Sequence, residues 1–237
     1  MMVKKSIKKT VKILAMVLVL ALITGVAAFF LYVSQYYKVD DHVAAAISNN
    51  AAVRYQENYL LIPATGESES ALVFYPGAKV EFLAYYPLLN KISQHGITCV
   101  VVDMPFHLAF FNSSAIERMV DDFPEVKRWF IGGHSLGGAM ASHYASTHQD
   151  KISGLILLGA YIYGEYPVEQ SITIYGSNDQ IINRSKITYK ENVYLIDGGN
   201  HAQFGNYGEQ KGDGIATISR EEQQSITVQL IVDFLRQ

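Results

Sequence analysis

The stretch WFIGGHSLGGAMASHYA, Trp129–Ala145, decides the fold. Its first residues are typical of a buried strand and its last residues of a helix, and Ser135 lies between glycines at the junction. The residues GHSLG match G-x-S-x-G, a pattern in which a sharp strand-to-helix turn holds a serine hydroxyl outward. A phosphate-binding loop is disfavoured because the glycine spacings of such loops are not met. The plain alternative is a glycine-rich turn with an incidental serine.

Apolar runs of strand length recur through most of the chain. They are continuous rather than alternating, which is typical of strands buried on both faces of a parallel sheet. Helical stretches separate several of them, so the sequence predicts an α/β fold with an open, mostly parallel, doubly wound sheet and helices on both faces. In such sheets, ligand chemistry gathers at the carboxyl ends of the strands. The runs are 71–75, 97–102, 128–132, 154–158, 171–175 and 192–196.

Two helix starts are also predicted. Ser114 with Glu117, and Ser219 with Glu222, have the spacing of a capping box, in which the two side chains satisfy amides at the start of a helix. In the last helix, Ile226, Leu230 and Phe234 recur every fourth residue and are expected on one face.

Composition argues against a nucleic-acid partner, a cysteine nucleophile, and a metal or dinucleotide cofactor. The chain has 237 residues, of which 49% are hydrophobic and 17% charged, enough for one well-buried core. A net charge of −3 gives no sign of a nucleic-acid partner. The single cysteine, Cys99, lies in an apolar run, where a core thiol is favoured over a nucleophile. With no metal-ligand spacing and no dinucleotide fingerprint, neither a metal nor a cofactor is predicted.

A serine needs a base to act as a nucleophile at neutral pH, and that base needs an acid to orient it. His201 follows the run 192–196 in the turn DGGNHAQFG and is the preferred base, with His107 as second choice. Asp179 follows the run 171–175 in a polar turn and is the preferred acid, with Asp103 as the alternative. The order Ser135, Asp179, His201 is one of the known triad orders.

Acyl transfer also needs donors for the developing oxyanion, and backbone amides can supply them. The N–H of Leu136, directly after the serine, is the first expected donor. The second is expected from the loop YPGAKVE after the run 71–75, where Gly77 lets the backbone approach. Ala78 is the preferred donor there and Lys79 the substitute.

Together the stretches YPGAKV, VVVDMPFHLAFF, GGHSLGGAMA, YGSNDQI and GGNHAQFGNYG resemble the α/β-hydrolase superfamily, and more narrowly its small bacterial fold-5 branch. The resemblance covers about residues 54–237 and implies a serine hydrolase fold with Ser135, Asp179 and His201 as the triad. Many relatives insert a helical cap after the sixth strand. Here only 12 residues, GAYIYGEYPVEQ, separate two strands, so no cap domain and an open site are expected.

Aromatic residues are expected around this site and favour an apolar acyl or alcohol group. We expect Phe106, His107, Tyr161 and Phe204 to contact substrate; for each aromatic residue, packing in the core is the equal alternative. The sequence thus predicts a carboxylesterase with an acyl-enzyme intermediate and an ester or acyl substrate. The alternatives are a thioesterase, acyltransferase or peptidase with the same triad, and an inactive hydrolase-fold module that binds a partner.

The N-terminal segment is basic and then apolar. Residues 1–12 hold five lysines and no acidic residue, and residues 13–33 carry no charge. That run has the length of about 20 residues that a helix needs to cross a membrane, and flanking lysines stay cytoplasmic. We expect a basic cytoplasmic segment at 1–12, a signal anchor at 13–33, a tether at 34–50 and an extracytoplasmic catalytic domain at 51–237. Cleavage after Ala28, which would secrete the domain, is the alternative.

Overall fold

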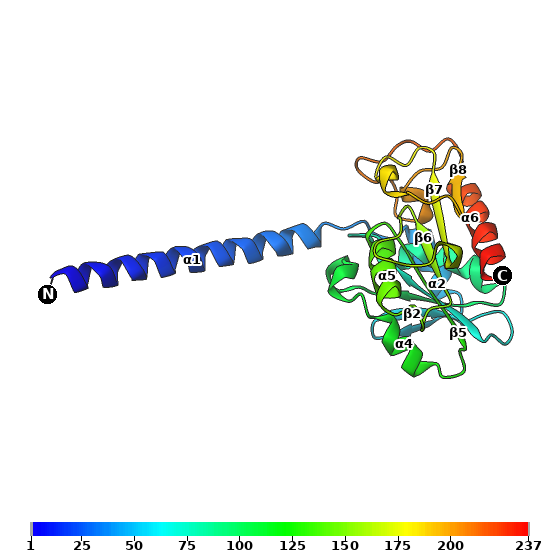
Figure 1. The fold of residues 1–237 in the computed structure, drawn as a ribbon, viewed down its shortest axis with the longest axis horizontal. Helices are drawn as coiled ribbons and strands as arrows, with labels where there is room; N and C mark the ends of the chain where they lie inside the picture. The colour runs from blue at the N-terminus through cyan, green and yellow to red at the C-terminus, as the bar shows by residue number, and fades with distance from the viewer. Residues whose placement is uncertain (1, 237) are drawn as a thin grey trace. The chain divides into compact units, whose positions relative to one another are not determined.

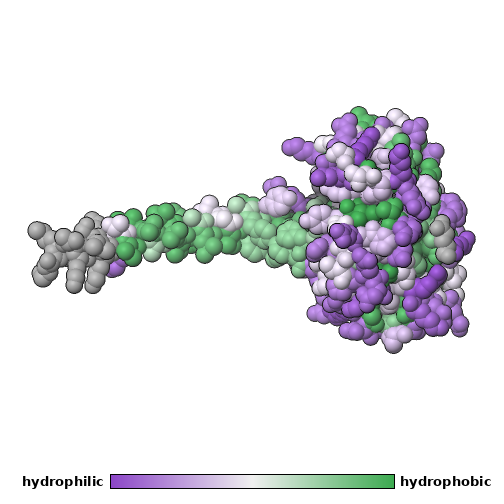
Figure 2. Space-filling model, in the orientation of Figure 1, coloured by the Kyte–Doolittle hydropathy of each residue, from purple (hydrophilic) through white to green (hydrophobic). Residues whose placement is uncertain are grey.

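The computed structural model describes residues 2–236, with side chains from residue 10 onward, and divides into two compact units at Tyr36/Tyr37. The first unit is one helix, α1 (Met2–Ser34). The most apolar 18-residue window of its stretch Thr10–Ser34 has a mean hydropathy of 2.8 and no buried residues, and Figure 2 shows the apolar surface of this helix. The helix is long and apolar enough to cross a membrane, a property that an anchor and a signal sequence share.

The second unit alternates strands and helices. The longer helices are α2 (Asp41–Ser48), α3 (Tyr86–Ser93), α4 (Ile116–Asp122), α5 (Leu136–Thr147) and α6 (Arg220–Leu235). The strands are β1 (Arg54–Gln56), β2 (Tyr59–Ile62), β3 (Ser70–Tyr75), β4 (Thr98–Val102), β5 (Arg128–His134), β6 (Gly154–Leu158), β7 (Ser171–Gly176) and β8 (Val193–Ile196).

These strands form one sheet in the order β1-β2-β4-β3-β5-β6-β7-β8. The pairs β1/β2 and β2/β4 are antiparallel, and every later pair is parallel. The six predicted strands are all present, and their bounds agree with the predicted ones to within two residues. The predicted mostly parallel, doubly wound α/β fold is confirmed. Its parallel strands place their carboxyl ends, and the loops that follow them, along one edge of the sheet.

The core has two layers because side chains on each strand alternate between the two faces of the sheet. Leu72 and Phe74 of β3 face a layer packed under α2, α3 and α6, whereas Val73 and Tyr75 face a layer packed under α4 and α5. Figure 1 shows α5 and α6 on opposite sides of the sheet. Cys99 is fully buried in the first layer, and burial raises the pKa of its thiol, as expected for a core thiol rather than a nucleophile.

Two local predictions about helices need correction. The helix predicted to start at Ser114 begins at Ile116, and its cap position, Ala115, has no side chain that can cap. In α6, Ile226 is exposed rather than part of the buried face, because polar residues near the start of the helix turn inward instead. The capping residue Ser219 does accept a hydrogen bond from the Glu222 N–H at 3.1 Å.

The connection between β6 and β7 contains no long helix. Between β6 and β7, the structure has only one short 3-10 turn, Val168–Gln170, so no helical cap covers this edge. The other 3-10 turns of the second unit are Phe82–Tyr85, Pro105–His107, Ala109–Phe111, Arg184–Lys186 and Ala202–Phe204.

Residues Tyr37–Asn50, within the segment predicted to be a tether, belong to the second unit. Val43 and Ile47 of α2 are buried in its core, and Tyr37 pairs with Val80 in an isolated parallel bridge. The compact unit therefore begins before the predicted domain boundary at residue 51.

Candidate active site

Ser135 occupies a strained turn between β5 and α5. Its backbone has φ 53° and ψ −122°, a conformation that residues other than glycine rarely adopt. The Ser135 N–H donates a hydrogen bond to the Leu158 carbonyl at the end of β6 at 2.9 Å, and this bond helps to hold the turn. Strain of this kind costs about 1–3 kcal/mol and persists where the surrounding structure fixes it. The turn leaves the serine half-buried at the carboxyl edge of the sheet.

Glycines make this sharp turn sterically possible. A Cβ atom on Gly137 would overlap the carbonyl oxygens of Tyr75 and Pro76, and one on Gly138 would lie 2.6 Å from the Ala160 Cβ. Helix α5 therefore runs closer to the ends of its neighbouring strands than any side chain would permit.

His201 and Asp179 form a buried pair. Nδ1 of His201 lies 2.8 Å from Oδ2 of Asp179, and the exposed fractions of the two residues are 1% and 2%. The other carboxylate oxygen accepts hydrogen bonds from the N–H groups of Ile181 and Ile182, each at 2.9 Å. A carboxylate only accepts, so in the neutral imidazole of His201 the proton lies on Nδ1 and the lone pair on Nε2.

The lone pair on Nε2 of His201 is free to accept a proton in the cavity that Ser135 lines. Within the described part of the chain, Nε2 of His201 is buried without a hydrogen-bond partner. Ser135 and His201 line one cavity of about 300 Å³, together with Leu136. A serine and a base often reach hydrogen-bond distance only when substrate is bound. The cavity thus brings together the predicted nucleophile, the predicted base and one predicted oxyanion donor.

In the loop after β3, the backbone N–H groups on either side of Ala78 are hydrogen-bonded within the protein. The Gly77 N–H donates to the Tyr85 hydroxyl at 3.0 Å, and the Lys79 N–H donates to the His107 carbonyl at 2.8 Å. The N–H of Ala78, between them, has no such bond among the described residues. Leu136 is the first residue of α5, where backbone N–H groups lack intrahelical acceptors. This arrangement favours Ala78 over Lys79 as the second donor, beside Leu136.

A second histidine lies behind the first. His134 is fully buried, its ring centroid is 4.3 Å from that of His201, and its Nδ1 lies 2.8 Å from the Tyr85 hydroxyl. Burial is the main cause that lowers the pKa of His134 well below its usual value, and the nearby His201 adds to it, while a backbone interaction with His201 opposes it. His134 is therefore neutral. The Tyr85 hydroxyl thus accepts from the Gly77 N–H and also forms a hydrogen bond with Nδ1 of His134, whose direction depends on the tautomer of the ring.

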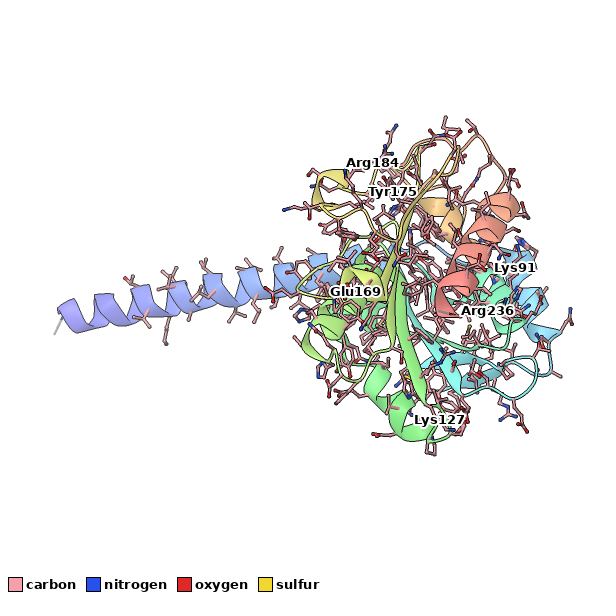
Figure 3. The ribbon with its side chains drawn as sticks, turned by 45° about the vertical axis from the view of Figure 1, so that its right-hand side comes forward. Lys91, Lys127, Glu169, Tyr175, Arg184 and Arg236 are labelled. Carbon is pink, nitrogen blue, oxygen red and sulfur yellow. The ribbon has the colours of Figure 1, made fainter. Side chains whose placement is uncertain are left out.

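Polar side chains hold the loops that carry Asp179 and His201. The Arg184 guanidinium donates to the carbonyls of Ser177 at 2.7 Å and Asp179 at 2.9 Å, and it lies over the ring of Tyr175. Figure 3 labels both Arg184 and Tyr175. The Gln223 amide pairs with both the N–H and the carbonyl of Asn200, the residue before His201, at 2.9 and 2.8 Å. These bonds explain why Gln223, in the first turn of α6, is buried although it is polar.

The residues predicted to contact substrate separate into three places. Tyr161 lines the cavity of Ser135. Phe106 and His107 instead line a different cavity, of about 360 Å³, with the alternative acid Asp103, so neither His107 nor Asp103 joins the His201 pair. Phe204 is fully buried in the core, with its ring 5.7 Å from that of His134, because the turn after His201 points it inward. Phe204 thus has the alternative placement, in the core, and is not among the residues that line the cavity of Ser135.

Several residues of the site were not predicted: Tyr85, His134, Ile181, Ile182 and Asn183. The last three lie within four residues after Asp179, so the turn that carries the acid could have suggested them as lining residues. No sequence signal distinguishes Tyr85 from the other tyrosines. Among the described residues, no group of three or more His, Cys, Asp or Glu side chains could hold a metal ion.

Comparison with known proteins agrees with this fold. The chain is similar in fold to Est1E from Butyrivibrio proteoclasticus, with 13% identity, 79% of this chain and 100% of that chain covered, and a TM-score of 0.58. It is also similar to a monoglyceride lipase from Saccharomyces cerevisiae, solved with a substrate analog, with 12% identity, 77% and 92% coverage, and a TM-score of 0.57. MenH from S. aureus gives 17% identity, 76% and 98% coverage, and a TM-score of 0.55.

In sequence, the chain is 27% identical over 99 residues to a protein of Mycobacterium phage D29 described as a non-heme haloperoxidase. That match covers 38% of this chain and only 35% of the phage protein. Residues 71–225, well over half of the chain, match the alpha/beta hydrolase family. With the sheet order, the turn at Ser135 and the family match together, the chain belongs to the α/β-hydrolase family.

Proposed function

We propose that the protein is a membrane-anchored, extracytoplasmic serine hydrolase, and specifically a carboxylesterase. One observation carries this proposal: the buried Asp179–His201 pair leaves Nε2 of His201 without a partner in the cavity that Ser135 lines. A buried acceptor without a partner is costly, and it is what a general base for the serine hydroxyl requires.

The proposed reaction has two acyl-transfer steps. Nε2 of His201 takes the Ser135 proton as the serine oxygen attacks the ester carbonyl, and Asp179 stabilises the resulting imidazolium. The N–H groups of Ala78 and Leu136 donate to the oxyanion. His201 then returns the proton to the leaving alcohol, which leaves an acyl-enzyme on Ser135. A water molecule that His201 deprotonates attacks this ester and releases the acid.

The lining of the cavity supports an apolar substrate group. Apart from Ser135, Asn183 and His201, the cavity is lined by glycine, alkyl and aromatic side chains, with Ile181 and Ile182 next to the acid. The cavity has a volume of about 300 Å³ and no helical cap covers it, so it suits a small or medium acyl or alcohol group. The rest of a larger substrate would lie in solvent. Two of the similar structures, the yeast lipase with its substrate analog and Est1E with ferulic acid, support carboxylic esters as the class.

The proposed location rests on α1. Its apolar stretch is preceded by lysines, which favours a cytoplasmic N-terminus and supports a second unit outside the cytoplasm. A cysteine substituted for Glu67, an exposed residue in the loop between β2 and β3, should then react with a membrane-impermeant maleimide on intact cells. The unaltered chain is the control because its one cysteine, Cys99, is buried. Reaction only after the cells are lysed would contradict the proposed location.

The activity is tested with the full chain in detergent, on p-nitrophenyl esters from acetate to decanoate. The account predicts turnover that is lost in Ser135→Ala. Faster turnover of matched thioesters or amides would favour a thioesterase or a peptidase, and transfer to an added alcohol would favour an acyltransferase. No turnover of any acyl substrate by the folded chain would favour the inactive binding module.

A further inference from the structure

Residues Tyr37–Asp40, here called the strap, bind the loop that carries Ala78. The Tyr37 N–H donates to the Lys79 carbonyl at 2.7 Å, and the Glu81 N–H donates back to the Tyr37 carbonyl at 2.9 Å. The Val39 N–H donates to a carboxylate oxygen of Glu81 at 3.0 Å. The strap thus adds a short strand-like contact to the backbone directly after the proposed oxyanion donor.

The strap also binds the loop that follows His201. The Asp40 N–H donates to the Asn206 carbonyl at 2.9 Å, and the Tyr37 hydroxyl accepts from the Lys211 N–H at 3.2 Å. The Asp40 carboxylate pairs at 2.9 Å with Arg220, the first residue of α6, and both side chains are about a quarter exposed. These four residues therefore connect two loops that come from distant parts of the chain.

The contact at Lys79 falls on a strained residue. Lys79 has φ 58°, in the left-handed region that residues without special support avoid. Its N–H is held by His107 and its carbonyl by Tyr37, so both adjoining peptide groups are fixed from outside the loop. The peptide on the N-terminal side of Lys79 joins it to Ala78, so the conformation of Lys79 helps to set where the Ala78 N–H points.

We propose that the strap is a positioning element of the active site, which fixes the oxyanion loop relative to the His201 loop. The inference rests on the proposed hydrolase function. Only Gln35 and Tyr36 separate the strap from the last residue of α1, so the segment that leaves the apolar helix is also part of the catalytic framework. Cleavage after Ala28 would leave the strap in the mature chain, so an anchored and a processed protein would both keep it.

The test compares two substitutions at one position in the full chain. Tyr37→Ala removes the ring and hydroxyl but keeps the N–H, whereas Tyr37→Pro also removes the N–H that holds the Lys79 carbonyl. We expect kcat for p-nitrophenyl butyrate to be at least about tenfold lower in Tyr37→Pro than in Tyr37→Ala, with KM within about twofold. The loss of a whole oxyanion donor, about 10²–10³-fold, sets the upper limit. The pH profile of kcat should not move, because the Asp179–His201 pair stays intact.

A second variant covers the case in which Tyr37→Pro does not fold. Asp40→Asn breaks the ion pair with Arg220 and should lower kcat at least about threefold. Asp41→Asn, the same change at the exposed neighbouring residue, should leave kcat unchanged. The charge swap Asp40→Arg with Arg220→Asp should restore part of the activity.

Two failures are distinguishable. If the unaltered chain hydrolyses no ester, the proposed function fails and the strap proposal falls with it. If the unaltered chain is active, and folded Tyr37→Pro and Asp40→Asn keep kcat within about twofold of their controls, only the strap proposal is overturned.

Discussion

Replacing Asp179 by asparagine tests the orientation of His201 with little change in shape. The asparagine carbonyl can still accept from the N–H groups of Ile181 and Ile182, which now lie 2.9 Å from the carboxylate. Its NH₂ group then lies where Oδ2 is now, 2.8 Å from Nδ1 of His201. Two donors cannot face each other in a buried site, so the histidine changes tautomer and Nε2 gains the proton.

That tautomer cannot take the proton of Ser135, and the positive imidazolium also loses its carboxylate. In serine hydrolases the same exchange lowers kcat by about 10⁴-fold, which corresponds to about 5.5 kcal/mol of transition-state stabilisation. Because the two backbone hydrogen bonds remain, we expect the thermal midpoint to change by only a few degrees, as about 1 kcal/mol implies for a chain of this size.

The assay is kcat for p-nitrophenyl butyrate between pH 6 and 9, with thermal unfolding as the check on folding. Asp197→Asn is the matched control, since Asp197 accepts a hydrogen bond from Ser177 at 3.2 Å and should be dispensable. Asp103→Asn tests the alternative acid. A folded Asp179→Asn enzyme within about tenfold of the unaltered kcat would refute the reasoning, and a large loss in Asp103→Asn alone would move the role of the acid there.

The remaining predictions concern residues around the triad. Tyr85→Phe leaves the Gly77 N–H and His134 Nδ1 without partners, and should cost about 2 kcal/mol in urea unfolding and lower kcat about tenfold. Tyr75→Phe is the control, because the Tyr75 hydroxyl also takes part in two hydrogen bonds: it donates one to Ser113 and accepts one from Ile116. It should lower the free energy of unfolding by the same amount and leave kcat unchanged. An equal loss of kcat in both variants would count against a positioning role of Tyr85. The pKa of His134 is well below 6.5 in the folded chain, whereas in the unfolded chain this histidine takes up a proton near pH 6.5. The free energy of unfolding should therefore fall as the pH drops below about 6.5. The urea midpoint should drop less between pH 7.5 and 5 in His134→Asn, and an identical drop would contradict this. Ile182→Ala should raise kcat/KM for octanoate relative to acetate about tenfold; an unchanged ratio would place the acyl group elsewhere.

Periodicity and turn chemistry were enough to predict the sheet and the turn at Ser135. Buried parallel strands read as continuous apolar runs, and glycines around one serine permit a close approach of helix and strand that few other sequences allow. The order of the strands then placed Asp179 and His201 at the same edge, where the structure brings them within 2.8 Å of each other.

The supporting groups could not be predicted because their signals depend on tertiary contacts. Gln223 at the start of α6 looks like a solvent-facing residue until its amide pairs with the backbone beside His201. The strap reads as a polar linker, and its backbone bonds to Lys79 leave no trace in composition. Phe204 carries no mark that separates a core aromatic residue from one that lines a cavity, so only the backbone turn after His201 decides its direction.

The central claim is that Ser135 is a nucleophile activated by His201. The most direct measurement incubates the full chain with a fluorophosphonate and locates the adduct by mass spectrometry, with Ser135→Ala and Asp179→Asn as controls. The account predicts one adduct on Ser135, none in Ser135→Ala and much slower labelling in Asp179→Asn. A folded chain that forms no adduct, or forms it on another residue, would contradict the account.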